Sequence, residues 1–118
     1  MSLQEKACRL IYSVIRARCP IDTGNLATHG ITIESDFSKI FIGNEVADYA
    51  EYTNEPWTHG TNPNEGWIDN AIQEALPLVK NLLSGTISQT EYDQIISDYE
   101  QILKTRMDAR AKELLGEL

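Results

Sequence analysis

The sequence has 118 residues, of which 42% are hydrophobic and 24% are charged. A chain of this length is expected to form a single domain, residues 1–118, that buries roughly two thirds of its unfolded surface. The formal net charge is −8. A global excess of acid disfavours nucleic-acid binding, which depends on Lys and Arg side chains at the phosphates. We therefore expect no sequence-specific nucleic-acid partner.

The sequence gives no indication of a membrane segment, a metal site or a cofactor site. No apolar run approaches the ~20 residues that a membrane span requires, and no signal-peptide pattern is present, so we expect a cytoplasmic protein without membrane contact. His29 and His59 are the only histidines, and no zinc-binding spacing occurs. The carboxylates of Asp48, Glu51 and Glu55 lack the glycine-punctuated loop of Ca²⁺ sites. We expect neither a metal nor a cofactor.

Residues 4–19 have the spacing of an amphipathic helix. Its apolar face consists of Ala7, Leu10, Ile11, Val14 and Ile15. Pro20 cannot continue the helix, so we expect the helix to end at residue 19. Cys8 and Cys19 would lie about 16 Å apart at ~1.5 Å per residue, which is beyond the span of a disulfide. The two cysteines are therefore predicted to be reduced thiols in a reducing compartment.

The segment Pro20–Leu26 has two interpretations. Asp-Thr-Gly is the active-site triplet of aspartic proteases, in which two aspartates share a proton and activate a water. That hypothesis requires a mostly β-structured chain, whereas most of the chain after this segment has helical spacing. In the structural interpretation, Asp22 is the N-cap of a helix and Ile21 packs on Leu26 as a hydrophobic staple. We favour the structural interpretation and keep a homodimeric protease that uses Asp22 as an alternative.

The middle of the chain predicts a β-hairpin, a short helix and a long loop. Residues 28–34 and 39–43 alternate β-branched or aromatic residues around the turn 35–38, which is typical of an antiparallel hairpin. Residues 45–52 are predicted to form a short helix. Residues 53–62 form the one long irregular segment, and loops of this length in a compact domain are often functional.

A long helix is predicted from residue 63 to residue 83. Asn62 is its expected N-cap, and Pro63 occupies the first helical position, where proline is favoured. The apolar positions keep their helical phase across Pro77, which predicts one kinked helix rather than two. Trp67 lies in phase with the apolar face and is expected to be a core residue.

The last helix is predicted to begin at a capping box formed by Ser88 and Glu91. At about 26 residues and ~1.5 Å per residue it is longer than the helix before it, so its C-terminal end should overhang. That end carries Leu114, Leu115 and Leu118, which we expect to pack on the first helix of the same chain. The predicted fold class is α+β, with an antiparallel β-hairpin or small sheet packed on an N-terminal helix and a C-terminal helical hairpin.

Two segments resemble the signatures of one protein family. Pro20–Leu26 is similar to the Pro-x-Asp-Thr-Gly-x-Leu signature of the tail-component, or tail-completion, family of tailed phages with long non-contractile tails. Its matching residues are Pro20, Asp22, Thr23, Gly24 and Leu26. Tyr49–Tyr52 is similar to the Tyr-Ala-x-Tyr segment of that family. The resemblance covers roughly residues 4–83; residues 62–68 differ from the family's Gly-Thr turn and Pro-x-Pro-Phe-Leu segment, and residues 84–118 form an additional long helix.

The resemblance implies a structural component of a phage or prophage particle at the head–tail junction, which acts by protein–protein assembly and not as an enzyme. The implied partners are other phage structural proteins, namely the connector, the tail tube or the terminator, with copies of the chain in a homo-oligomeric ring. The implied location is the host bacterial cytoplasm during assembly and then the virion. A cytoplasmic helical-hairpin interaction module unrelated to phages is a further alternative.

The charges are unevenly distributed along the chain. Residues 1–20 carry four basic residues and one acid, a net +3, whereas residues 21–79 carry ten acids and one lysine, a net −9. A solvated acidic face is one interpretation, and a head-to-tail contact between copies is the other. Trp and Tyr side chains dominate interface hot spots. The candidate interface residues are Arg16, Arg18, Tyr49, Glu51, Tyr52, Glu55 and Trp57.

Overall fold

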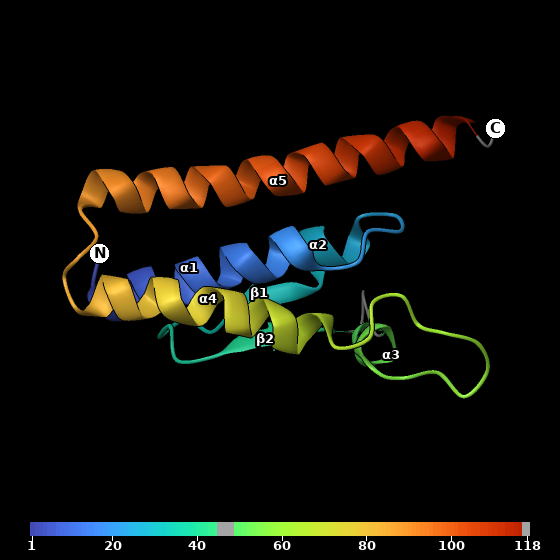
Figure 1. Cartoon of the computed structure of the whole chain (residues 1–118), viewed down its shortest axis with the longest axis horizontal. Helices are drawn as coiled ribbons and strands as arrows, with labels where there is room; N and C mark the ends of the chain where they lie inside the picture. Colours follow the sequence, from blue (N-terminus) through green and yellow to red (C-terminus); the bar gives the residue numbers. More distant parts are fainter. Residues whose placement is uncertain (45–48, 117–118) are drawn as a thin grey trace.

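The computed structural model of the protein describes residues 1–44 and 49–116, and the chain has the α+β fold that the sequence predicts. In chain order its elements are α1 (Leu3–Arg18), α2 (Asn25–His29), β1 (Ile31–Ile33), β2 (Ile40–Ile42), α3 (Ala50–Asn54), α4 (Trp67–Leu83) and α5 (Gln89–Gly116). Figure 1 shows α1 between α5 on one side and α4 with the two strands on the other.

α1 forms the centre of the fold. The Ser2 side chain caps its N-terminus by accepting a hydrogen bond from the Glu5 N–H. Extended backbone at Cys19, directly before Pro20, ends the helix. The predicted helix over residues 4–19 is therefore confirmed to within one residue at each end. Cys8 and Cys19 are both buried free thiols.

Two clusters of buried side chains attach the other helices to α1. The larger cluster joins α1 to α2, β1, α4 and α5, and it includes Val14 and Leu103. The smaller cluster joins Leu10 of α1, Leu82 of α4 and Tyr92 of α5. Because α5 contributes buried side chains to both clusters, this additional helix is part of the hydrophobic core.

The predicted β-hairpin is confirmed, with shorter strands than expected. β1 and β2 pair antiparallel over three residues each, with Ile31 opposite Ile42. Thr28 and His29, assigned to the first strand from the sequence, instead form the last turn of α2. This helical turn buries Leu26 almost completely, so core packing outweighs the β propensity of the threonine.

α4 begins later than predicted. Its first residue is Trp67, and the residue before it, Gly66, has a left-handed conformation with φ 75°. The helix start predicted at Asn62 is therefore wrong. The buried Asn62 side chain instead closes the preceding loop, because its amide donates to the carbonyl oxygens of Thr53 (2.9 Å) and Glu55 (2.7 Å).

The segment before this loop is held to the start of α4. Of the short helix predicted over residues 45–52, residues 45–48 lie outside the described part of the chain. The described remainder contains the start of α3 at Ala50, which is buried. Trp67 is a core residue, as predicted, and its indole N–H donates to Thr53 Oγ1 over 2.9 Å. The tryptophan therefore joins α3 to α4.

α4 and α5 form the predicted helical hairpin. α4 is a single helix through Pro77, and Gly85, with φ 77°, follows its end. The predicted capping box is confirmed: the Glu91 N–H donates to Ser88 Oγ (3.1 Å), and the Ser88 N–H donates to Glu91 Oε1 (3.3 Å). Both ends of the connection therefore have the signals that the sequence indicated.

α5 overhangs the rest of the helical body. It has 28 residues against 17 for α4, or about 42 Å against about 26 Å at ~1.5 Å per residue. Figure 1 shows its C-terminal end extending past the ends of α1 and α4. Leu114 is half-buried, but Leu115 is 69% exposed. The expectation that this end packs on α1 is wrong for Leu115, because α1 already ends at Arg18. Leu118 lies outside the described residues.

Candidate functional site

The two segments that carry the family resemblance lie beside one cavity. We call this hollow the signature cavity; its volume is about 540 Å³. It is lined by Pro20–Asp22, by residues in and next to α3, by residues of the loop that follows α3, and by Arg106 of α5. Tyr49, Tyr52 and Trp57 form its aromatic wall. Three of the seven candidate interface residues are therefore brought together.

The aromatic wall has a fixed arrangement. The rings of Tyr52 and Trp57 stack with their centroids 5.1 Å apart and an angle of 16° between their planes. The indole N–H of Trp57 also donates to the Tyr52 carbonyl oxygen over 3.0 Å. The Tyr52 side chain remains 60% exposed. An ordered aromatic surface of this kind is available to a partner at little cost in side-chain entropy.

Arg106 adds a cation to the signature cavity. Its guanidinium donates to the carbonyl oxygen of Ala17 in the last turn of α1, where the helix dipole favours positive charge. No carboxylate of the described residues forms an ion pair with Arg106. No sequence pattern indicated Arg106, because only the packing of α5 across the end of α1 places it there.

Asp22 is held by α5 and does not cap a helix. The N-cap of α2 is Gly24, with φ 85°, which has no side chain to form a cap hydrogen bond. The predicted N-cap role of Asp22 is therefore wrong, because the left-handed glycine delays the helix start to Asn25. Asp22 Oδ1 pairs with Arg110 Nη2 at 2.9 Å, and the Arg110 Nε–H donates to the Asp22 carbonyl oxygen over 3.0 Å.

The other residues of the signature have structural positions. Leu26 and Ile21 both pack in the larger core cluster, which agrees with the part of the staple hypothesis that places them inside. Thr23 Oγ1 accepts a hydrogen bond from the Asn25 N–H at 3.4 Å. Asp22 is 78% exposed in its side chain. Its carboxylate therefore has an arginine partner and solvent contact, an environment unlike that of two aspartates sharing a proton.

The arginines of the candidate interface have partners within the chain. Arg16 pairs with Glu100 of α5 (3.0 Å). Arg18 forms two hydrogen bonds with the Glu74 carboxylate of α4 (2.9 and 3.0 Å). Basic and acidic segments thus already meet inside one copy. Glu51 and Glu55, the acids among the candidate interface residues, are exposed.

Glu74 also accepts a hydrogen bond from the Tyr99 hydroxyl at 2.6 Å, so the ion pair connects α1, α4 and α5. The hydrogen bond from Arg18 lowers the pKa of Glu74 below its usual value. Burial and the bond to Glu74 raise the pKa of Tyr99 to about 12. Both shifts favour the charged carboxylate and the neutral phenol, which is the state that the network requires.

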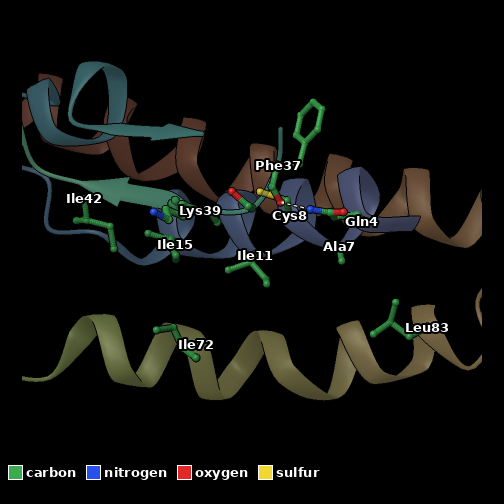
Figure 2. A pocket seen from close by; sticks show the side chains of 12 residues that line it. Gln4, Ala7, Cys8, Ile11, Ile15, Phe37, Lys39, Ile42, Ile72 and Leu83 are labelled. Carbon is green, nitrogen blue, oxygen red and sulfur yellow. Dashed lines mark hydrogen bonds between the residues drawn. The ribbon is translucent and has the colours of Figure 1, made fainter. Parts of the chain in front are cut away.

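A second hollow lies on another face of the molecule. We call it the α1–α4 groove; its volume is about 710 Å³, and it is lined by residues of α1, of the hairpin and of α4. Figure 2 shows Ile72 and Leu83 of α4 pointing toward α1, and Ile11 of α1 pointing toward α4. The Gln4 amide donates to the Phe37 carbonyl oxygen at 3.3 Å and joins α1 to the hairpin turn.

The described residues contain no cluster of His, Cys, Asp and Glu that could hold a metal ion. In the same residues, no helix is both long and apolar enough to cross a membrane. Comparison of the chain with protein-family models, with curated proteins and with solved structures gave no match.

Proposed function

We propose that this protein is a structural component of a tailed phage or prophage particle, located at the head–tail junction, and that it acts by protein–protein assembly. One observation supports the proposal above the others. The two segments that resemble the tail-component family, Pro20–Leu26 and Tyr49–Tyr52, are distant in the sequence, yet residues of both line the signature cavity.

The chemistry of the signature cavity fits a protein partner. Aromatic residues and arginine are enriched at the centres of protein interfaces, where they form hot spots. Trp57 and Tyr52 supply a stacked aromatic pair, and Arg106 supplies a half-buried guanidinium. The proposed partners are the connector, the tail tube or the terminator, with copies of this chain in a ring. Assembly would begin in the host bacterial cytoplasm and end in the virion.

The proposal is tested by deleting the gene from the bacterial genome that carries it and inducing particle production. Electron microscopy should show filled heads and separate tails that do not join. A plasmid copy of the gene should restore joined particles, and Trp57→Ala should not, although the protein accumulates normally. Thr58→Ala, a change at the exposed neighbouring position, is the matched control and should restore them.

Two outcomes would contradict the proposal. Normal particles after deletion would exclude a role in joining heads to tails. A gene whose neighbours include no portal, major capsid or tail-tube genes would leave the helical-hairpin interaction module as the better hypothesis.

A further inference from the structure

The chain exposes more surface than a compact protein of the same mass. A compact protein of 13.3 kDa is expected to expose about 6,450 Å², whereas this chain exposes 7454 Å². The excess of about 1,000 Å² exceeds the roughly 800 Å² that each partner buries in a standard-size interface. The radius of gyration, 15.3 Å, is also larger than the about 13.5 Å expected for this length. The molecule is therefore elongated, and its surface exceeds that of a compact chain by about the area that one partner buries in an interface.

Part of this surface is an apolar stripe on α4. Ile72, Leu76 and Leu83 are 37%, 49% and 56% exposed, and their spacing places them on one side of the helix. This stripe adjoins the α1–α4 groove, because Ile72 and Leu83 line it. Among the described residues that line the groove, Lys39 alone carries a charge. Low charge and exposed aliphatic side chains are typical of the centre of an interface.

The α5 overhang is a helix end without a core to cover. Beyond Arg110, Ala111, Leu114 and Leu115 share one face at spacings of three and four residues. α5 packs against both α1 and α4, but none of its described residues lines the α1–α4 groove, and its C-terminal end extends past the ends of both helices (Figure 1). Its end therefore cannot turn into the α1–α4 groove of its own chain.

We propose that the α5 overhang of one copy, residues 111–116, lies in the α1–α4 groove of a second copy. Amphipathic helices bind apolar grooves through side chains at spacings of three, four and seven residues, and the overhang supplies Ala111, Leu114 and Leu115. The groove face from Ile72 to Leu83 is about 16 Å long at ~1.5 Å per residue. That length accommodates the six residues of the overhang, which span about 9 Å at ~1.5 Å per residue.

Such a contact joins two different surfaces, so it repeats from copy to copy and closes a ring or extends a filament. The inference rests on the self-assembly part of the proposed function and names the contact that would produce it. It also gives the additional helix a role, because α5 provides both a part of the core and the connection to the next copy.

The test uses sedimentation velocity of the whole chain and its variants over a range of concentrations. The unmodified chain should form larger species as concentration rises. Truncation after Arg110 removes the overhang but leaves the groove, and Leu83→Glu blocks the groove but leaves the overhang. Each variant alone should remain monomeric. An equal mixture of the two should form a heterodimer that grows no further, because only one productive contact is possible.

Matched variants separate the contact from general effects of charge and folding. Leu115→Glu should act like the truncation, whereas Ala109→Glu, at an exposed position on the opposite side of α5, should associate normally. Gln73→Glu on α4 is the corresponding control for Leu83→Glu. Circular dichroism should give the same helix content for all point variants.

Three results would overturn the inference. The first is a monomeric chain at every concentration, including millimolar. The second is association of the truncated chain alone, which would indicate a groove-to-groove contact. The third is failure of the two blocked variants to form a heterodimer.

The contact and the proposed function can fail separately. Association that persists in both blocked variants would refute this contact and leave ring assembly intact. Normal particles after gene deletion would refute the phage role and leave the contact intact.

Discussion

Asp22 offers the sharpest test of how the Pro20–Leu26 segment is held. Its carboxylate pairs with Arg110 at 2.9 Å, while the backbone carbonyl of Asp22 accepts a separate hydrogen bond, so changing the side chain removes the ion pair alone. The Asp22 side chain is 78% exposed, and exposed pairs typically contribute roughly 0.2–1 kcal/mol. We therefore expect Asp22→Ala to lower the free energy of unfolding by about 0.5 kcal/mol.

Asp22→Asn distinguishes the ion pair from a helix cap. Asparagine caps a helix about as well as aspartate, so a capping role would leave the Asn variant as stable as the original chain. The ion pair requires the charge, so the Asn and Ala variants should lose similar amounts. Urea unfolding at low salt and at about 1 M salt is the assay. At the higher salt the screening length falls to about 3 Å, and the loss should shrink.

A double-mutant cycle with Arg110→Gln isolates the pairwise interaction. The coupling between the two positions should be about 0.2–1 kcal/mol at low salt. Full stability of Asp22→Asn, or a loss of about 2 kcal/mol in Asp22→Ala that salt does not change, would refute the ion-pair assignment and restore the cap. Peptide cleavage that Asp22→Asn abolishes would instead support the protease alternative.

Four further changes test the turn at Gly24 and the packing of the long helices. Gly24→Ala forces a left-handed residue and places a new Cβ 3.0 Å from a side-chain atom of α5; urea unfolding should show a loss of at least about 1–2 kcal/mol. Leu10→Ala empties a fully buried position between three helices and should cost about 3–5 kcal/mol, so a loss below about 1 kcal/mol would contradict the assigned packing. The pKa of Tyr99 is raised to about 12. Its contribution to the free energy of unfolding is therefore complete below pH 10, the usual pKa of tyrosine, and is lost as the pH rises toward 12. Tyr99→Phe should flatten the alkaline part of the curve of stability against pH. The pKa of Glu74 is lowered, so its contribution to the free energy of unfolding is present above pH 4.5, the usual pKa of glutamate, and is lost as the pH falls below that value. Glu74→Gln should remove this loss of stability in acid. An unchanged curve of stability against pH would contradict the assigned ion pair.

The long helices were predictable from the sequence because their signals are local. Apolar residues at helical spacing, Pro20 after α1 and the capping box of Ser88 and Glu91 each act within a few residues of the element they define. The two wrong helix starts have a common cause. Gly24 and Gly66 both have positive φ directly before a helix, and each separates the predicted cap from the true start. A glycine immediately before an apolar helical run was the signal that could have found both.

The site was less predictable than the fold, because its charged residues belong to contacts between distant segments. Arg106 reaches the Ala17 carbonyl and Arg110 reaches Asp22, each across more than half of the sequence. Charge segregation along the chain left open a solvated acidic face or a contact between copies. α4 brings Glu74 to Arg18 within one copy, and no local pattern specifies which helices become neighbours.

The additional helix holds the signature segment, Pro20–Leu26, through Arg110. The N-cap residue Gly24 has no side chain to cap α2, and the Asp22 carbonyl and carboxylate are both held by Arg110 of α5. One turn earlier on α5, Arg106 holds the end of α1 and lines the signature cavity. α5 therefore holds this turn by donating hydrogen bonds to its carbonyl and carboxylate oxygens, whereas a cap would accept hydrogen bonds from backbone N–H groups of the helix. A partner that binds at the signature cavity thus contacts residues that α5 holds in place. The family resemblance, which covers roughly residues 4–83, does not include this helix.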